Sequence, residues 1–316
     1  MARYLVTGVA GFIGSAVASA LLARGDEVIG VDNLSTGHKD NIPAGVQFFQ
    51  AGCQDEDLYS RILPRHAYDA IFHIAGQSSG EISFDDPVYD LRTNTESTLH
   101  LLRFAQECGC TRFIYASSMS VYGTQPDEPV TEDACPAPQS FYAVGKLASE
   151  QYLELYEDRG IRSTCLRLFN VYGPGQNMAN MRQGMVSIYL AMMVNDGHIH
   201  VKGNPNRYRD FVYIDDVVAA FLLCLSREQS CGKVLNIGGS GKVLVGDVVD
   251  KLCALCSTPV TVEYSGMTPG DMHGIHADVN MAAKFLGYEA EVGLDEGLAR
   301  MYAWYTRHKA AQRGQG

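Results

Sequence analysis

The stretch VTGVAGFIGSAVASALLARG, residues 6–25, constrains the fold most, because it sets three glycines between an apolar run and a helical one. Gly8, Gly11 and Gly14 follow the run YLVTG and lead into SAVASALLARG. Glycines at a strand–helix turn permit a tight bend and let the backbone approach a pyrophosphate, whose charge the helix N-terminus stabilises. The stretch therefore predicts the first strand–turn–helix unit of a dinucleotide-binding fold.

An acidic residue follows at the end of the second apolar run, EVIGVD, which closes on Asp32. A carboxylate at this place accepts hydrogen bonds from ribose hydroxyls and repels a 2′-phosphate. A turn with a capping Asp would be a purely structural alternative. The order of the two features along the chain favours a cofactor site, with NAD preferred over NADP.

Apolar strands and amphipathic helices alternate through the first half of the chain, a pattern typical of a parallel sheet covered on both faces. After Gly173 the pattern loosens into the polar loop GPGQNMANMRQG, and the last ~70 residues mix short helices and loops. We predict an α/β fold with a doubly wound (Rossmann) parallel sheet and a smaller mixed C-terminal substrate domain. The NAD-binding domain is expected over 1–171 and 211–239, and the nucleotide-sugar-binding domain over 172–210 and 240–316.

Composition limits the classes of partner. The 316 residues carry a net charge of −11, which argues against nucleic acid or an anionic membrane surface. No segment approaches the roughly 18 uninterrupted apolar residues of a membrane-spanning helix, and the chain opens on a strand rather than a signal peptide. A cytoplasmic protein is expected.

The nine cysteines and nine histidines show no spacing typical of a metal site, so we predict no metal. Reduced thiols are the simplest expectation for this odd number of cysteines. Cys253 and Cys256 form a CxxC in VVDKLCALC, which predicts a helix whose apolar face buries both thiols.

The heptapeptide SFYAVGK places Tyr142 and Lys146 one helical turn apart on the same face. A protonated lysine near a phenol lowers the tyrosine pKa from about 10 towards neutrality, and a positively charged nicotinamide would act in the same direction. Such a phenolate can remove a hydroxyl proton while hydride leaves the same carbon. The serines of YASSMSVYG, about 25 residues upstream, could bridge the phenol and a substrate oxygen. By itself the pair would more often be an exposed tyrosine and a solvated lysine.

Four motifs together resemble the extended short-chain dehydrogenase/reductase family: the GxxGxxG spacing, DNLSTG, HIAGQSS and RTNTESTLHLL. The resemblance implies that Tyr142 is the acid/base, Lys146 its electrostatic partner and Ser118 the hydroxyl member. One departure is Cys53, where the family often has an Asp that binds the adenine amino group. The cofactor-binding residues implied by the resemblance are Gly8, Gly11, Phe12, Ile13, Gly14, Asp32, Asn33, Ala75, Gly76, Asn94, Tyr142 and Lys146.

The residues beside Ser118 help to choose among the nucleotide-sugar enzymes of this family. Its 4,6-dehydratases carry Thr-Asp-Glu before the VYG landmark, whereas this chain has Ser118, Met119 and Ser120. Elimination of water lacks its acid and base without those carboxylates. The resemblance is therefore strongest to UDP-glucose 4-epimerase-like nucleotide-sugar epimerases, which oxidise C4 to a 4-keto intermediate and return hydride to the opposite face. A 4,6-dehydratase or dehydrogenase, or a non-catalytic NAD-binding subunit, is the alternative.

The substrate residues rest on the same resemblance. It implies substrate binding by Ser118, Asn170, Arg209 and Asp271, although Arg209 could instead form an ion pair with Asp210 or Asp215. Departures from the family pattern are Thr268 in place of an arginine and Lys202 in place of an aromatic residue. An aliphatic Ile275 at the position that limits the sugar pocket favours room for an N-acetyl group. A UDP-hexose or a UDP-N-acetylhexosamine is the expected substrate.

A homodimer is also implied, because members of this family pair the helices expected near 92–108 and 142–158 into a four-helix bundle. The apolar residues of the second helix fit that arrangement but could equally cover the sheet. They are Leu147, Tyr152, Leu153 and Tyr156.

Overall fold

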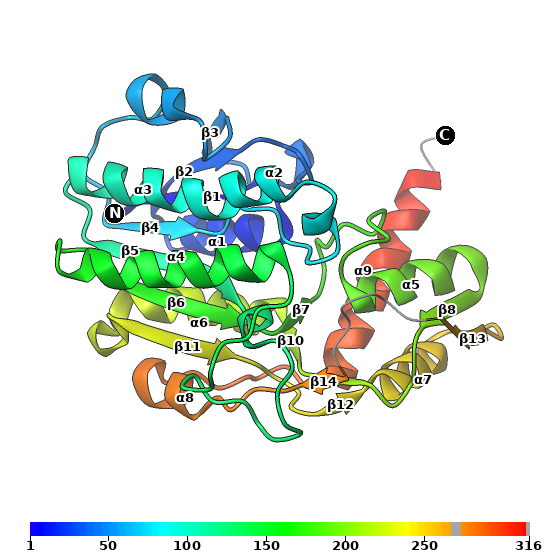
Figure 1. Cartoon of the computed structure of the whole chain (residues 1–316). Coiled ribbons are helices and arrows are strands. Elements are labelled where there is room, and N and C mark those ends of the chain that lie inside the picture. The colour runs from blue at the N-terminus through cyan, green and yellow to red at the C-terminus, as the bar shows by residue number, and fades with distance from the viewer. Residues whose placement is uncertain (267–272, 314–316) are drawn as a thin grey trace.

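The computed structural model describes residues 1–266 and 273–313. A seven-stranded parallel sheet lies at its centre, in the order β11-β6-β5-β4-β1-β2-β3 (Figure 1). The strand order reverses beside β1, so a crevice for a ligand is expected at the carboxyl ends of β1 and β4. The predicted doubly wound α/β fold is confirmed. The strands are β1 (Arg3–Thr7), β2 (Glu27–Asp32), β3 (Gln47–Gln50), β4 (Ala70–His73), β5 (Arg112–Ser118), β6 (Arg162–Leu168) and β11 (Lys233–Ile237).

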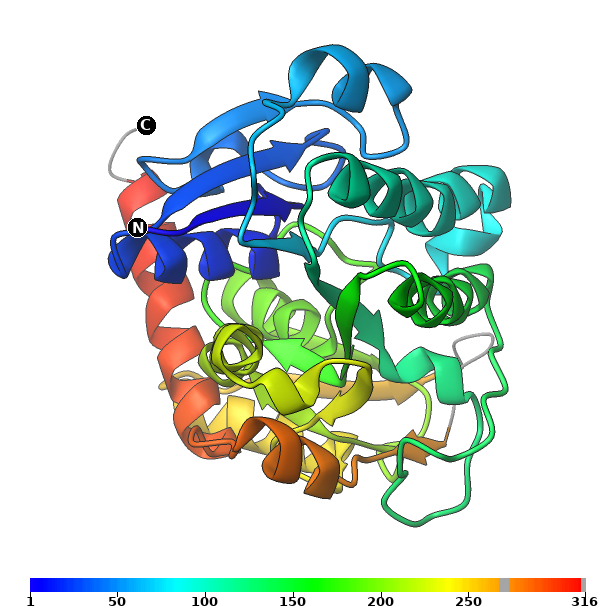
Figure 2. The same ribbon diagram turned by 90° about the vertical axis from the view of Figure 1, so that its left-hand side faces the viewer.

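Helices cover both faces of this sheet (Figure 2). On one face, α1 (Phe12–Ala23), α6 (Ile214–Ser226) and α8 (Asn280–Leu286) bury their apolar residues against the strands. On the other face, α3 (Ser97–Glu107) and α4 (Phe141–Glu157) enclose a second apolar core. Short helical segments complete this half: η1 (Lys39–Asn41), η2 (Leu58–Ile62), η3 (Ile82–Phe84), α2 (Pro87–Leu91), η4 (Arg92–Glu96), η5 (Met119–Tyr122) and η6 (Glu228–Ser230).

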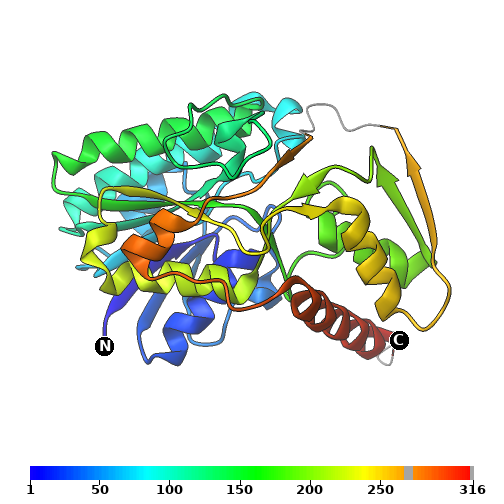
Figure 3. The same cartoon turned by 90° about the horizontal axis from the view of Figure 1, so that it is seen from below.

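A smaller lobe with its own apolar core lies beside the sheet (Figure 3). Its helices are α5 (Met185–Asp196), α7 (Val245–Leu255) and α9 (Leu294–Arg313). Three small sheets accompany them. They pair β8 (His198–Lys202) with β13 (Thr261–Ser265), β9 (Tyr208–Arg209) with β12 (Val243–Leu244) and β14 (Gly274–Ile275), and β7 (Asn170–Tyr172) with β10 (Phe211–Tyr213).

Two C-terminal features differ from the prediction. Helix α8, which the predicted division puts in the second domain, packs on α6 and β11 because Ala282, Leu286 and Tyr288 join the apolar core of the large sheet. Helix α9 is 20 residues long rather than one of several short helices.

The CxxC prediction was wrong in part. Helix α7 ends at Leu255, so Cys256 lies just beyond it. Cys253 and Cys256 are both half-buried at the margin of the smaller lobe's core, and neither is fully enclosed. Within the described ranges, no helix is long and apolar enough to span a bilayer.

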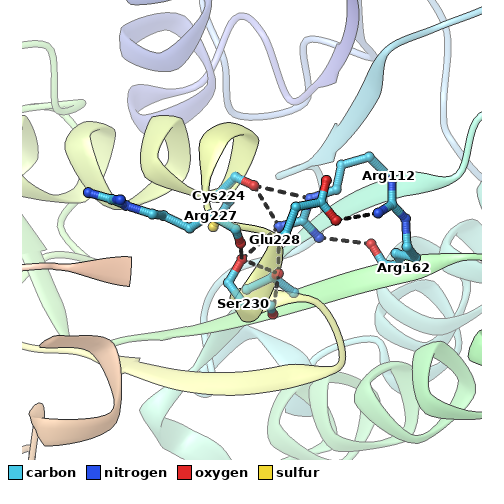
Figure 4. A network of polar contacts seen from close by, with 7 residues as sticks. Arg112, Arg162, Cys224, Arg227, Glu228 and Ser230 are labelled. Carbon is cyan, nitrogen blue, oxygen red and sulfur yellow. Dashed lines mark hydrogen bonds and ion pairs between the residues drawn. The ribbon is translucent and has the colours of Figure 1, made fainter. Parts of the chain in front are cut away.

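Arg112 links the amino end of β5 to neighbouring segments of the chain (Figure 4). Arg112 is buried, with 7% of the residue exposed, and its guanidinium donates to oxygens from three segments of the chain. The acceptors are the carbonyls of Cys224 (2.8 Å) and Arg162 (2.8 Å) and the hydroxyls of Thr164 (2.7 Å) and Ser230 (3.0 Å). A buried cation whose donors are paired in this way joins α6 firmly to β5 and β6.

Candidate active site

The glycine turn after β1 is packed so tightly that side chains are excluded. A Cβ on Gly14 would lie 2.0 Å from the Gly8 carbonyl oxygen, and one on Gly8 would lie 2.9 Å from the Ala75 nitrogen. Gly8 also has a φ of +73°, which disfavours other residues. The turn therefore brings the N-terminus of α1, capped by Gly11, against the turn after β4. An anion can approach backbone N–H groups closely there.

Asp32 holds this turn from the end of β2. One carboxylate oxygen accepts a hydrogen bond from the Ala10 nitrogen at 3.0 Å, and the other accepts from the Leu34 nitrogen at 2.7 Å. A carboxylate oxygen can accept more than one hydrogen bond, so this anchoring leaves capacity for ribose hydroxyls.

A cavity of about 210 Å³ opens over the glycine turn. Buried Cys53 and its neighbour Gln54 lie on its wall, and burial raises the pKa of the Cys53 thiol to about 12. Cys53 is therefore a neutral apolar wall where the family often has a carboxylate. The wall also includes these residues predicted for the cofactor: Gly8, Gly11, Phe12, Ile13, Gly14, Asp32, Asn33, Ala75 and Gly76.

Asn94 is absent from the described residues that line this cavity and supports it from behind. Its amide nitrogen donates to the Gln77 carbonyl at 3.0 Å and to the Asp90 carboxylate at 3.2 Å. A Cβ on Gly76 would lie 2.4 Å from the Asn94 amide oxygen. Asn94 thus fixes the turn after β4 rather than facing the cavity itself.

A second cavity of about 350 Å³ adjoins the first and contains the predicted catalytic residues. Ser118, Tyr142 and Lys146 all line it, together with Asn170. Tyr142 and Lys146 share one face of α4, as predicted, because the helix begins at Ser140, whose hydroxyl accepts from the Ala143 nitrogen at 3.2 Å. The structure therefore brings together residues that lie up to 52 positions apart in the sequence, from Ser118 to Asn170.

Lys146 is buried at 4% exposure beneath this cavity. Its Nζ donates to the Ala116 carbonyl at 2.9 Å and lies 4.9 Å from the Tyr115 ring centroid and 5.6 Å from that of Tyr142. Burial lowers the pKa of Lys146 to about 8, and the Asp90 carboxylate opposes this shift. Lys146 is therefore a cation at neutral pH, but it loses its proton at a lower pH than an ordinary lysine does.

The predicted direction of the Tyr142 pKa was wrong for the protein by itself. Burial raises the pKa of the phenol to about 12, and interaction with Ser118 offsets only part of that increase. The phenolate is disfavoured because the surroundings desolvate it while the Lys146 ammonium is engaged by the Ala116 carbonyl. A phenolate at neutral pH therefore requires further positive charge at the site.

The serines at the end of β5 have separate environments. Ser118 Oγ accepts hydrogen bonds from the Ser120 nitrogen at 3.2 Å and from the Ser120 hydroxyl at 3.0 Å. Ser117 donates to Glu150, which forms a buried ion pair with Arg167 at 2.7 Å. The geometry favours Ser118 over Ser117 as the hydroxyl near Tyr142.

The predicted substrate residues are less closely gathered. Asn170 lies at the start of β7, where its amide donates to the Asp210 carbonyl at 3.0 Å. Buried Arg209 donates to the Tyr208 carbonyl at 2.7 Å, and burial lowers its pKa to about 10. It is not among the described residues that line the two cavities. Asp271 and Thr268 lie outside the described residues.

Asp210 and Asp215, the two carboxylates that could have paired with Arg209, both have other partners. Asp210 accepts hydrogen bonds from backbone nitrogens of Gly239, Ser240, Gly241 and Ala277, and so organises the loop after β11. Asp215 pairs with Arg300 at 3.3 Å. Lys202 is exposed, and Ile275 is buried.

The segment 174–184 was missed as part of the site. Gln176 and Gln183 line both cavities, and Asn177 lines the first. The sequence shows only a loop rich in Gly, Asn and Gln, and such a composition carries no signal for a particular ligand.

No group of three possible metal ligands occurs among the residues of 1–266 and 273–313. His73 is buried in β4 between the hydroxyls of Thr7 at 2.9 Å and Thr98 at 3.1 Å. Burial lowers its pKa to about 3, so the imidazole is neutral and structural.

The model of the NAD dependent epimerase/dehydratase family matches residues 4–238. The chain belongs to this family. Its expected relation to the extended short-chain dehydrogenases/reductases is thereby confirmed.

Similar proteins within the family align along nearly the whole chain. The chain is 33% identical to a UDP-glucose 4-epimerase of Mycolicibacterium smegmatis, over 96% of this chain and 98% of that protein. The structure of UDP-glucose 4-epimerase from Thermotoga maritima with UDP-glucose superposes with a TM-score of 0.93 at 34% identity, covering 97% and 99% of the two chains. The Thermus thermophilus UDP-glucose 4-epimerase in complex with NAD gives 0.89 at 31% identity, covering 96% and 99%.

Proposed function

We propose that this protein is an NAD-dependent nucleotide-sugar 4-epimerase acting on a UDP-hexose or a UDP-N-acetylhexosamine. The observation that carries the proposal is that Ser118, Tyr142 and Lys146 line one cavity directly beside the glycine-turn cavity. The similar proteins that are named UDP-glucose 4-epimerases, one solved with UDP-glucose and one with NAD, support the same reaction.

The first cavity fits NAD. The backbone of Gly8, Gly11 and Gly14 leaves room for a pyrophosphate at the N-terminus of α1, and Asp32 would accept the adenosine ribose hydroxyls. Ala75 and Gly76 would face the nicotinamide half, with Asn94 behind them. When bound, NAD supplies reversible hydride acceptance and a positive charge near the phenol.

The residues of α4 and β5 then account for the proton transfer. Tyr142 takes the proton from the C4 hydroxyl as C4 loses hydride and is oxidised. After the 4-keto sugar has rotated and hydride has returned to the opposite face of C4, Tyr142 gives the proton back to the C4 oxygen. Lys146 stabilises the phenolate and would also bind the nicotinamide ribose, while Ser118 orients the sugar oxygen. The pKa of about 12 for Tyr142 in the protein alone makes this chemistry dependent on a bound positive charge.

Substrate binding is proposed for Ser118, Asn170, Arg209 and Asp271. Asn170 lies on the wall of the catalytic cavity, and the Arg209 guanidinium suits a diphosphate. Asn170 lies on β7 and Arg209 on β9, and the catalytic cavity has walls from both lobes, such as Tyr142 on α4 and Val186 on α5. Substrate in the cavity would therefore contact both lobes.

A dehydratase is the main alternative, and the catalytic cavity disfavours it. Among the described residues that line this cavity, none is an aspartate or glutamate. Eliminating water from C5 and C6 needs such an acid and base. A non-catalytic subunit is disfavoured because both Tyr142 and Lys146 are present and adjacent.

Nuclear magnetic resonance of UDP-glucose, UDP-galactose and their N-acetylated forms, incubated with the purified protein, tests the reaction. Inversion at C4 is expected, and Tyr142→Phe should slow it by about a thousandfold. Tyr152→Phe, on the same helix, is the matched control. A deoxy or stable keto product without inversion would exclude the epimerase.

We also propose a homodimer formed through α4 and the neighbouring helices. Of the four apolar residues named from the sequence, Leu153 is buried in the core, and Leu147, Tyr152 and Tyr156 are half-buried against core residues. The exposed apolar side chains are Phe141, Val144 and Leu155 on α4 and Val88 and Leu91 on α2, which contacts α4. Large apolar residues gathered in this way favour a protein interface.

Leu155→Asp should halve the mass measured by light scattering, whereas the exposed polar substitution Glu154→Gln should not. A monomeric wild-type protein would contradict the dimer.

A cytoplasmic location is proposed from the nine cysteines, all of which are free thiols.

A further inference from the structure

The segment 174–184 leads from β7 to α5 of the smaller lobe, and its residues Gln176 and Gln183 line both cavities. Several of its polar side chains are used to hold it there. Arg182 pairs with Asp85 at 2.7 Å and with Glu81 at 3.2 Å, and Gln183 donates to the Ser78 hydroxyl at 2.7 Å. These contacts fix the segment across the site.

Gln176 belongs to the same segment but differs from these tethers. Its amide oxygen is buried and has no hydrogen-bond partner among the described residues. Its side chain lines both cavities. Asn177 and Gln183, by contrast, each have a partner, His38 at 3.3 Å and Ser78 respectively.

The local backbone makes room for the Gln176 amide. Gly184 has a φ of +88°, and a Cβ there would lie 2.3 Å from the Gln176 amide nitrogen. A side chain at residue 184 would therefore displace the amide from the junction. The segment keeps an amide at this place although its oxygen has no hydrogen-bond partner among the described residues.

A buried acceptor without a partner is costly, and such groups are rare unless another molecule satisfies them. Of the other side chains that line both cavities, Phe12, Ile13 and Ile74 are apolar, and the amide of Gln183 donates to Ser78 rather than to Gln176. A ligand at the junction is the remaining source. An N–H or O–H group that reaches both cavities has the required chemistry.

We propose that Gln176 is a positioning residue whose amide oxygen accepts a hydrogen bond from the ligand where cofactor and sugar meet. The inference rests on the proposed function, since it places the cofactor in the first cavity and the sugar in the second. The donor is either the carboxamide of nicotinamide or a hydroxyl of the sugar. Either bond would set the face of the sugar relative to the cofactor.

Gln176→Met tests the proposal, because methionine has a similar size and lacks the amide acceptor. Isothermal titration of the nucleotide-free protein with NAD, and then with UDP-galactose in saturating NAD, separates the two donors. A roughly tenfold weaker NAD affinity identifies the carboxamide, and a roughly tenfold weaker sugar affinity with a raised KM identifies the sugar hydroxyl. Gln176→Glu, which retains an acceptor, should recover most of the loss.

Gln139→Met, on an exposed loop with its amide bonded to Thr124, is the matched control. If Gln176→Met leaves NAD affinity, sugar affinity and KM unchanged, the proposal is overturned, even if thermal stability changes. Failure of the proposed function would look different. Wild-type protein would then show no inversion at C4, while the two titrations would still report on Gln176.

Discussion

The two ends of β5 each lie beside a buried cation, and the surroundings of the two cations are opposite. At the amino end, Arg112 donates to four oxygens and is fully engaged (Figure 4). At the carboxyl end, Lys146 has one hydrogen bond, to Ala116, and burial lowers its pKa. Nearby, one carboxylate oxygen of Asp90 and the Tyr115 hydroxyl are buried and have no partner among the described residues.

This difference separates stability from function along a single strand. The amino end of β5 gains from its cation because each guanidinium nitrogen has a hydrogen-bond acceptor. The carboxyl end retains a cation that burial disfavours, and such strain is typical of sites selected for chemistry. The four predictions below test this contrast, from the largest expected effect to the smallest.

Removing the cation at the carboxyl end should abolish activity without weakening the fold. Lys146→Met is expected to lower kcat for C4 inversion by about a thousandfold, because the phenolate of Tyr142 loses its electrostatic partner. Urea denaturation of the nucleotide-free protein at pH 7 should show equal or greater stability. Lys284→Met, at an exposed position on α8, should change neither quantity. A clear loss of stability in Lys146→Met would contradict the contrast.

Removing the cation at the amino end should have the reverse effect. Arg112→Met leaves four buried oxygens without their donor and should cost about 3 kcal/mol of unfolding free energy. NAD affinity of the folded fraction should stay unchanged. Arg103→Met removes only an exposed ion pair with Glu107 and should cost less than about 0.5 kcal/mol. Equal effects of the two substitutions would remove the basis of the comparison.

The pH dependence of stability should reveal the strain on Lys146. Its pKa is about 8 in the folded protein and 10.5 ordinarily, so the folded state binds fewer protons between these values. The burial penalty is fully present below pH 8, and stability contributed by this group rises as the pH increases towards 10.5. The stability difference between Lys146→Met and wild type should therefore be largest, up to about 3 kcal/mol, below pH 8. A difference that does not shrink at higher pH would argue against this account.

Asp90 should contribute a smaller effect of the same kind. Burial raises the pKa of its carboxyl, so its protonated form is favoured in the folded state. Stability from this group is present at low pH and is lost as pH rises through that raised pKa. Asp90→Asn should remove this pH dependence and raise the stability of the protein to urea at pH 7. Asp86→Asn, exposed at the start of α2, is the control.

The sequence was sufficient for features that depend on local geometry. The glycine turn requires Gly8, Gly11 and Gly14 at fixed spacing, and a helix necessarily places Tyr142 and Lys146 on one face. These features predicted the fold, which is confirmed, together with the glycine-turn cavity and the phenol to which we assign the proton transfer. They required no knowledge of which segments meet in space.

Features that depend on tertiary burial could not be predicted. The pKa of Tyr142 moved opposite to the prediction because desolvation depends on everything that surrounds the phenol. The unpartnered amide oxygen of Gln176 depends on the cavity walls around it. The raised pKa of Asp90 depends on its burial beside Gln77 and Asn94. Neither relation leaves a pattern in the sequence.

The path of the chain between the lobes has a further consequence. The large sheet receives β11 and α6 only after the chain has visited the smaller lobe, and α8 returns to it later still. A fragment ending at residue 171 would expose the edge of β6 that β11 covers, and would lose the α6 carbonyl that Arg112 binds. Neither lobe can therefore complete its folding before most of the chain is made. Gene fusions should therefore keep the whole chain of this enzyme intact, and truncation at the boundary between its two binding regions should prevent either lobe from completing its folding.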